Sequence, residues 1–309
     1  MTSPPKIKYR LSNLHLNLFG NTYLVSTDGS LFFKASSMQE LRIYHQLALA
    51  HSQLLSFMPS LVGVYKCEGD ALNLLVDLSK DLCSADFEVL ESLLAVATKC
   101  RTFNCHGAIF TALKNLHNNT GTNSRTYFLD LKLGFITFPL DAQQSKIQSQ
   151  ETKARNTTTS THGIRLMGAV LPVSSKASMT ESVLLTKTEG RACSYNDVLA
   201  HLCTLFPDRH SLGQLVARLE ALSKSLLKEC LHMCGPSLLI SSIHQDHIDN
   251  RASYNILPSV FLVDFAHTYT RDQAITLCTN EDILSTTAST NIATCIESLS
   301  HNLQAYHSL

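Results

Sequence analysis

An aspartate and a lysine two positions apart end a short apolar stretch near the middle of the chain. Asp130 and Lys132 follow Phe128 and Leu129, and Gly134 comes two residues later. Residues two apart in an extended strand point to the same face, so the carboxylate and the ammonium would face one cavity. Such a pair suits phosphoryl transfer, in which a hydroxyl is positioned and phosphate charge is neutralised. The alternative is a solvated strand face that happens to carry two charges.

A second apolar stretch also ends in a carboxylate. Asp264 directly follows the apolar residues 261–263. A carboxylate at the end of a buried strand commonly brings a metal-binding oxygen into a cleft, although Asp264 could instead cap a turn or a helix. We expect residues 237–243 and 260–265 to be paired strands, which would bring Ser237 next to Asp264 at the edge of a nucleotide cleft.

Four segments resemble the signatures of the inositol polyphosphate kinase family, and they occur in the family's order. They are Asp-Leu-Lys-Leu-Gly at 130–134, Gly-Ile-Arg-Leu-Met-Gly at 163–168, Ser-Leu-Leu at 237–239 and Val-Asp-Phe-Ala-His-Thr at 263–268. Nearer the amino terminus, Lys34, Glu40 and Tyr44 are similar to the family's spacing of lysine, glutamate and tyrosine.

The resemblance implies an α+β, two-lobed, kinase-like fold, related to the protein kinase and ATP-grasp architectures. It also implies ATP-dependent phosphorylation of a soluble inositol polyphosphate with the help of Mg²⁺. The Ser/Thr run at 157–161 is similar to the hexakisphosphate kinase branch of the family. We therefore expect conversion of inositol hexakisphosphate to diphosphoinositol pentakisphosphate. The alternatives are a multikinase acting on lower inositol phosphates and an inactive inositol-phosphate-binding regulator.

The resemblance also implies a role for each candidate site residue. Asp130 and Lys132 would be catalytic, and Asp264 would hold the metal. Contacts to ATP are implied for Lys34, Glu40, Asp77 and Ser237, and contacts to the inositol polyphosphate for Lys132, Lys146, Lys153, Arg155 and Arg165. An ion pair with Glu40 would aim Lys34 at the ATP phosphates. Without the family spacing, Lys34 would be interpreted as a surface lysine.

The pattern of apolar and turn residues predicts three regions. Residues 1–80 form a small β-rich nucleotide lobe, with a hairpin of strands 23–26 and 31–34, a helix over 38–55, and strands at 61–65 and 72–76. Residues 81–124 form an inserted helical segment, whose second helix carries Ile109, Leu113 and Leu116. Residues 125–309 form the larger catalytic and substrate lobe, with a polar loop over 141–161, a helix from Ser194 and another from 211 to 234.

Composition narrows the function class further. The 309 residues carry 25 basic and 25 acidic side chains, so no broad basic surface points to nucleic acid. The chain lacks an apolar run of about 18 residues and a signal peptide, so we expect a soluble cytoplasmic or nuclear protein with reduced thiols. The leucines at 212–226 favour core packing over a coiled coil, and we expect a monomer that binds no membrane. Cys100, Cys105 and His106 are better explained as thiols beside a loop histidine than as a zinc site.

Overall fold

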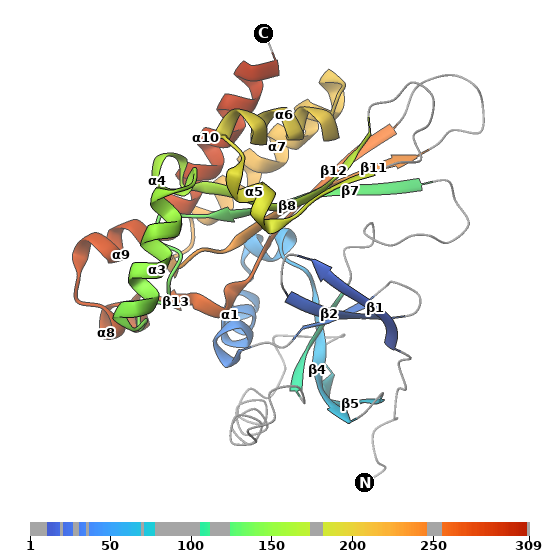
Figure 1. Cartoon of the computed structure of the whole chain (residues 1–309). Coiled ribbons are helices and arrows are strands. Elements are labelled where there is room, and N and C mark those ends of the chain that lie inside the picture. Colours follow the sequence, from blue (N-terminus) through green and yellow to red (C-terminus); the bar gives the residue numbers. More distant parts are fainter. Residues whose placement is uncertain are drawn as a thin grey trace. The chain divides into compact units, whose positions relative to one another are not determined.

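The computed structural model describes residues 11–18, 21–26, 31–34, 37–68, 71–77, 106–111, 124–173, 182–245 and 255–307. Contacts between residues divide the chain into two compact units, Met1–His117 and Asn118–Leu309. Each unit contains helices together with an antiparallel sheet (Figure 1). The expectation of an α+β protein with two lobes is therefore confirmed.

The first unit contains a six-stranded antiparallel sheet in the order β1-β2-β3-β6-β4-β5. Its strands are β1 (Leu11–Leu18), β2 (Asn21–Ser26), β3 (Leu31–Lys34), β4 (Leu61–Glu68), β5 (Ala71–Asp77) and β6 (His106–Thr111). Helix α1 (Met38–Leu49) begins after Ser37, whose side chain accepts a hydrogen bond from the Glu40 backbone N–H. The helix ends earlier than predicted, and a separate 3-10 turn, η1, covers Gln53–Phe57.

The predicted second helix of the inserted segment is wrong at Ile109, which lies in strand β6. This strand pairs with β3 on one side and with β4 on the other. A strand between two others has both of its backbone edges hydrogen-bonded, which a short helix there would not provide. Short apolar runs such as 108–111 do not distinguish strand from helix by spacing alone. The predicted helix near 87–97 lies outside the described residues.

The second unit is built on a five-stranded antiparallel sheet in the order β12-β11-β7-β8-β9. Its strands are β7 (Ser124–Leu133), β8 (Ile164–Pro172), β9 (Ser182–Leu185), β11 (Ser237–Gln245) and β12 (Asn255–Val263). The predicted pairing of residues 237–243 with residues 260–265 is confirmed as far as Val263, because β11 pairs with β12 along its whole length. Asp264 and Phe265 lie beyond the end of the strand. A small two-stranded sheet joins β10 (Leu231–Met233) to β13 (Thr268–Thr270).

Three helices pack together beside the five-stranded sheet: α6 (Tyr195–Leu205), α7 (Arg209–Leu226) and α10 (Ser289–His307) (Figure 1). The predicted start of a helix at Ser194 is confirmed, since this residue caps α6 and exchanges two hydrogen bonds with Asp197. The leucines of α7 that the sequence placed in a core are buried: Leu212, Leu215, Leu219, Leu222 and Leu226.

Two further sequence-based predictions in this unit are wrong. The segment predicted as a polar loop forms α3 (Gln144–Arg155) and the single turn α4 (Thr159–His162). Helix α3 forms because Gln, Lys, Glu and Ala are good helix formers even where no apolar stripe exists. The predicted 211–234 helix stops at Leu226, and residues 231–233 become β10. Pairing with β13 is a tertiary interaction that leucine spacing cannot reveal.

The remaining helices are short: α5 (Lys187–Ala192), α8 (Arg271–Leu277) and α9 (Glu281–Thr287). No helix among the described residues is long and apolar enough to span a membrane.

Candidate active site

Three neighbouring strands place the candidate residues in one row across the sheet. Lys132 on β7 lies opposite Ser237 on β11 and opposite Arg165 on β8. Directly opposed residues of an antiparallel pair share one face of the sheet, and Asp130 shares that face because it is two residues from Lys132. Gly134, with φ of 88°, then turns the chain away from the strand, as the sequence predicted.

Asp264 joins this row from the end of β12. Its predecessor Val263 lies opposite Ser237, so the chain leaves the sheet beside the Asp-x-Lys pair. An Asp264 carboxylate oxygen is 3.8 Å from the Lys132 Nζ atom. Asp264 has left-handed backbone angles, φ 68° and ψ 58°, which are rare for a residue with a side chain and concentrate at functional sites. It precedes the 3-10 turn η2 (Phe265–His267) but makes no side-chain cap bond to it, which removes the capping alternative.

Asp130 is a buried carboxyl group with a strongly shifted pKa. It accepts a hydrogen bond from the Ser237 side chain, whereas its Oδ1 atom is buried without a hydrogen-bond partner among the described residues. Burial is the main reason that the pKa of Asp130 rises to about 7, and repulsion from Asp264 adds to it. Lys132 and Ser237 act in the opposite direction. A carboxyl group with a pKa near neutrality is suited to accept a proton from a reacting hydroxyl.

An irregularity in the sheet lies beside Asp130. Asp130 pairs with Gly168 while the next residue, Leu131, pairs with Leu166, so β8 carries one extra residue at Met167. Such β-bulges change the direction of nearby side chains and are common next to active sites. This bulge brings Arg165 into register with Lys132.

Helix α5 supplies two cations that the sequence-based reasoning missed. The pKa of Lys187 is lowered by burial and by the positive charges of Arg191, Arg165 and Lys132, and raised by Asp130, so these groups lie close together. The helix can approach β8 because Gly190 has no side chain: a Cβ atom there would lie 2.9 Å from the Leu166 carbonyl oxygen.

Two arginines of this group have buried nitrogen donors without hydrogen-bond partners among the described residues. Arg165 is only 4% exposed, and its Nε and Nη1 atoms have no hydrogen-bond partner there. The Nε atom of Arg191 is also buried and has no hydrogen-bond partner among the described residues. Burial and the neighbouring Arg191 lower the pKa of Arg165, but a guanidinium remains protonated at neutral pH. Buried donors without acceptors are unfavourable unless an anion completes the site. We name Lys132, Arg165, Lys187 and Arg191 the cation cluster.

A signal for α5 was present in the sequence. Lys187 and Arg191 are four residues apart, which is the spacing of one helical face. The sequence did not show that this helix packs over β8, so Lys187 and Arg191 were not predicted as site residues.

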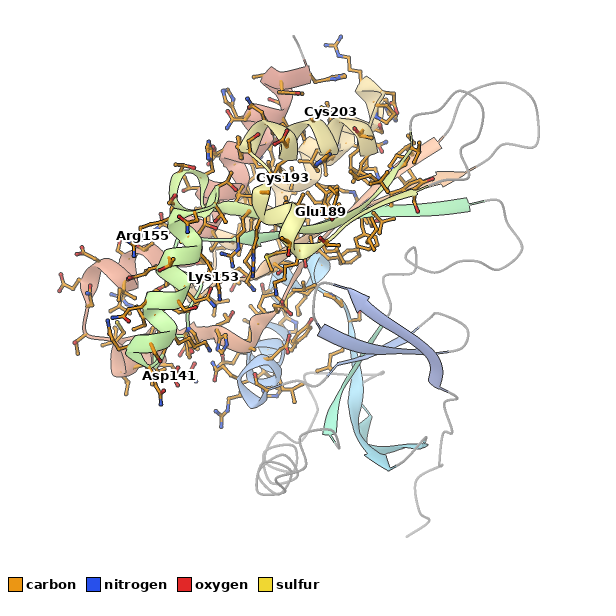
Figure 2. All side chains as sticks on the ribbon, viewed as in Figure 1. Asp141, Lys153, Arg155, Glu189, Cys193 and Cys203 are labelled. Carbon is orange, nitrogen blue, oxygen red and sulfur yellow. The ribbon has the colours of Figure 1, made fainter. Side chains whose placement is uncertain are left out.

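Helix α3 brings part of the predicted basic segment towards the row. Lys146, Gln150 and Lys153 share one helical face at positions i, i+4 and i+7, whereas Arg155 lies on the opposite face. Figure 2 shows Lys153 and Arg155 on opposite sides of α3. The Thr137 hydroxyl donates a hydrogen bond to the Gln150 side chain at 3.4 Å. Thr137 also lies close to the Lys132 side chain, because a Cβ atom on the adjacent Gly235 would touch both residues at 3.1 Å.

His267, three residues after Asp264, is affected by charges on α3 and β7. Burial lowers the pKa of His267, and the positive charges of Lys146 and Lys132 lower it further, while Asp141 and Asp264 oppose the shift. The imidazole therefore lies in the field of both lysines. The sequence motif contained His267, but the sequence-based reasoning gave it no role.

The described residues fit a hard divalent cation that is completed by a ligand. They contain no cluster of three or more His, Cys, Asp or Glu side chains that could hold a metal by protein groups alone. Mg²⁺ is usually bound through one or two carboxylates together with substrate phosphates and water. Asp264, with Asp130 close to it, has this donor chemistry.

The other residues predicted to contact ATP lie in the first unit. Lys34 is the last residue of β3 and lies opposite Ala108, and Asp77 is the last residue of β5 and lies opposite Gly63. Glu40 is in the first turn of α1 and is 2% exposed. The predicted ion pair between Lys34 and Glu40 stays a prediction.

Of the three residues considered for zinc, the two cysteines, Cys100 and Cys105, lie outside the described residues. His106 begins strand β6.

Comparisons with known proteins identify the family and the fold of this chain. The inositol polyphosphate kinase family profile matches residues 113–304. The structure of inositol phosphate multikinase Ipk2 from S. cerevisiae with ADP and Mn²⁺ is 16% identical, with a TM-score of 0.56 over 89% of this chain and 100% of that one. Another inositol phosphate multikinase structure is 18% identical, with a TM-score of 0.43 over 58% of this chain and 80% of that one. Comparison with curated protein sequences gave no match. Because the family profile covers more than half of the chain, this protein belongs to the inositol polyphosphate kinase family and is an inositol phosphate kinase.

Proposed function

We propose that this enzyme transfers the γ-phosphoryl group of ATP to a densely phosphorylated inositol, with inositol hexakisphosphate as the first candidate. The observation that carries the proposal is the cation cluster beside Asp130. Lys132 and Lys187 act electrostatically on this carboxyl group, whose pKa is about 7, and Arg165 and Arg191 in turn act on Lys187. Nearby negative charge comes from Asp130 and Asp264, so an acceptor with several phosphates would balance the excess.

Each residue of the row has a task in this reaction. Asp130 would accept the proton of the attacking hydroxyl, and Ser237 would orient the carboxylate through its hydrogen bond. Lys132 would neutralise the charge that develops on the transferred phosphoryl group. Asp264 would hold Mg²⁺, which would offset the phosphate charge that develops during transfer.

The acceptor would lie against the remaining cations. Arg165 offers two buried donors that have no partner in the described part of the chain, and such donors suit a phosphate group. Lys146 and Lys153 on α3 would meet phosphates on the more solvated side. Because Arg155 lies on the other face of α3, it serves as the matched control for Lys153. We expect Lys153→Gln to raise the KM for the polyphosphate about fivefold, the scale of one partly solvated ionic contact, and Arg155→Gln to leave it unchanged.

The choice between hexakisphosphate and lower inositol phosphates remains to be tested. The Ser/Thr run that favoured the hexakisphosphate branch makes backbone bonds: the Thr157 hydroxyl donates to the Lys153 carbonyl and the Thr158 hydroxyl to the Ile164 carbonyl. In this structure the run therefore shapes the turn between α3 and α4. A multikinase acting on lower inositol phosphates is the second candidate, and the cation cluster favours the more highly charged acceptor.

A panel of acceptors separates these functions. The purified protein would be incubated with Mg·ATP and with inositol tris-, tetrakis-, pentakis- or hexakisphosphate, and the products resolved by anion-exchange chromatography. The proposal predicts a product more strongly retained than hexakisphosphate. Turnover of only the lower phosphates would identify a multikinase. Calorimetric binding of hexakisphosphate without any Mg·ATP-dependent product would identify a regulator. A Lys132→Ala variant provides the background for contaminating kinase activity.

A further inference from the structure

Helix α3 has no fully buried side chain and only two half-buried apolar residues, Ile147 and Ala154, so apolar packing alone holds it weakly. Helices in folded proteins are normally held by an apolar stripe against a core, and a short polar helix is marginal by itself. The bond from Thr137 to Gln150 is long, at 3.4 Å. Other contacts must therefore determine where Lys146 and Lys153 lie.

The turn between α3 and α4 provides one such contact. The Thr157 hydroxyl donates to the Lys153 carbonyl at 2.9 Å and also lies 3.2 Å from the Thr159 hydroxyl oxygen. Thr159, the first residue of α4, is 1% exposed. The last turn of α3 is thus bonded to a buried anchor, and the position of α4 determines the position of Lys153.

Helix α4 is in turn attached to the helical core by a pair of rings. The His162 imidazole stacks on the Tyr195 ring, with centroids 3.9 Å apart and planes 8° from parallel. Tyr195 is the first residue of α6 and is 9% exposed. Its hydroxyl oxygen accepts a hydrogen bond from the Asn302 side chain of α10 at 3.3 Å. The stack therefore connects α4 to two helices of the core.

We propose that His162 and Tyr195 are positioning residues for the acceptor: their ring stack holds α3 where Lys146 and Lys153 meet the inositol polyphosphate. This inference rests on the proposed function, which assigns those lysines to the acceptor. Arg165 differs from them because the pairing of β8 with β7 fixes its backbone directly. Loss of the stack should therefore weaken acceptor binding while leaving the phosphoryl-transfer row in place.

Steady-state kinetics of His162 variants tests the proposal. His162→Ala should raise the KM for the polyphosphate about three- to tenfold, the scale of one lost aromatic contact. The kcat and the KM for ATP should change less than about twofold, because Asp130, Lys132 and Asp264 stay in place. His162→Phe keeps a flat ring against Tyr195 and should restore the KM. His210→Ala, at an exposed histidine of α7, is the matched control.

A double-mutant cycle shows whether His162 acts through α3. If the stack positions Lys153, Lys153→Gln should have less effect in the His162→Ala background than in the wild type, whereas Arg155→Gln should have none in either. Additive effects would overturn the inference. It would also fail if His162→Ala and His162→Phe lowered kcat and thermal stability equally. If Lys146→Gln and Lys153→Gln leave the KM of the otherwise wild-type enzyme unchanged, these lysines do not bind the acceptor and the proposed function is wrong at this point. That result differs from additive effects, which would contradict only the role of the ring stack.

Discussion

Replacing Asp130 by Asn separates the folding penalty of a buried carboxyl group from its role in phosphoryl transfer. The substitution keeps the shape of the side chain and an acceptor for the Ser237 hydroxyl, and it removes the titration. In the wild type the pKa of Asp130 rises from 3.8 to about 7 through burial and repulsion from Asp264. The folded protein therefore holds this proton more tightly than the unfolded chain does.

The sign of the pH effect follows from that difference. Where the folded state binds more protons than the unfolded state, the free energy of unfolding falls as pH rises, here between 3.8 and about 7. Across this whole pH window the free energy of unfolding falls by at most about 4 kcal/mol. About 2 kcal/mol of this decrease occurs between pH 5.5 and 7. The advantage in Tm of Asp130→Asn over the wild type should therefore grow by about 4 to 8 °C from pH 5.5 to 8.

Differential scanning calorimetry at the two pH values measures this directly. Asp197→Asn is the matched control: hydrogen bonds from Ser194 lower the pKa of Asp197, so its titration lies below this pH range and its Tm difference should not change across it. In the kinetic assay, loss of a general base should lower kcat of Asp130→Asn by about two to four orders of magnitude. A Tm difference that does not change with pH would refute the burial of a titrating carboxyl. An unchanged kcat with a raised KM for ATP would show that Asp130 anchors the nucleotide instead.

Three further substitutions test the rest of the site. Lys132→Ala should lower kcat by about two to three orders of magnitude, as for other single transition-state contacts, with little change in calorimetric ATP binding; near-normal turnover would contradict the assignment of this row. In Asp264→Asn the asparagine can adopt the left-handed backbone conformation, but the variant should lose phosphoryl transfer and bind Mn²⁺ more weakly in the presence of ADP. Electron paramagnetic resonance measures the Mn²⁺ binding, and unchanged binding would show that other residues hold the metal. Gly190→Ala should displace α5 from the Leu166 carbonyl and raise the KM for the polyphosphate. The control Gly213→Ala should leave the KM unchanged, because its Cβ atom would meet nothing within 4 Å. Equal KM values for the two variants would show that α5 takes no part in acceptor binding.

The central row of the site was predictable from the sequence. Asp130 and Lys132 had to share a face because the strand period is two, and Asp264 had to stand at a strand end because the apolar run stops there. Pairing of the strand that begins at Ser237 with the strand that ends just before Asp264 followed from two neighbouring apolar runs. These predictions held because each depends on local periodicity and on short-range order along the chain.

Other features depended on contacts between distant segments. Ile109 entered a strand because β3 and β4 offered two open edges, and residues 231–233 left the leucine-rich helix to pair with β13. Arg155 looked equivalent to Lys153 until α3 formed and put it on the opposite face.

The cation cluster shows the same limit most clearly. The sequence by itself determined the family signatures, the Asp-x-Lys pair and the carboxylate at position 264. Only the tertiary structure brought Lys187 and Arg191 over β8, where they lie beside Arg165. Composition could not show this concentration, because 25 basic and 25 acidic residues cancel along the chain. The local field depends on distances in space, which folding sets and sequence order does not.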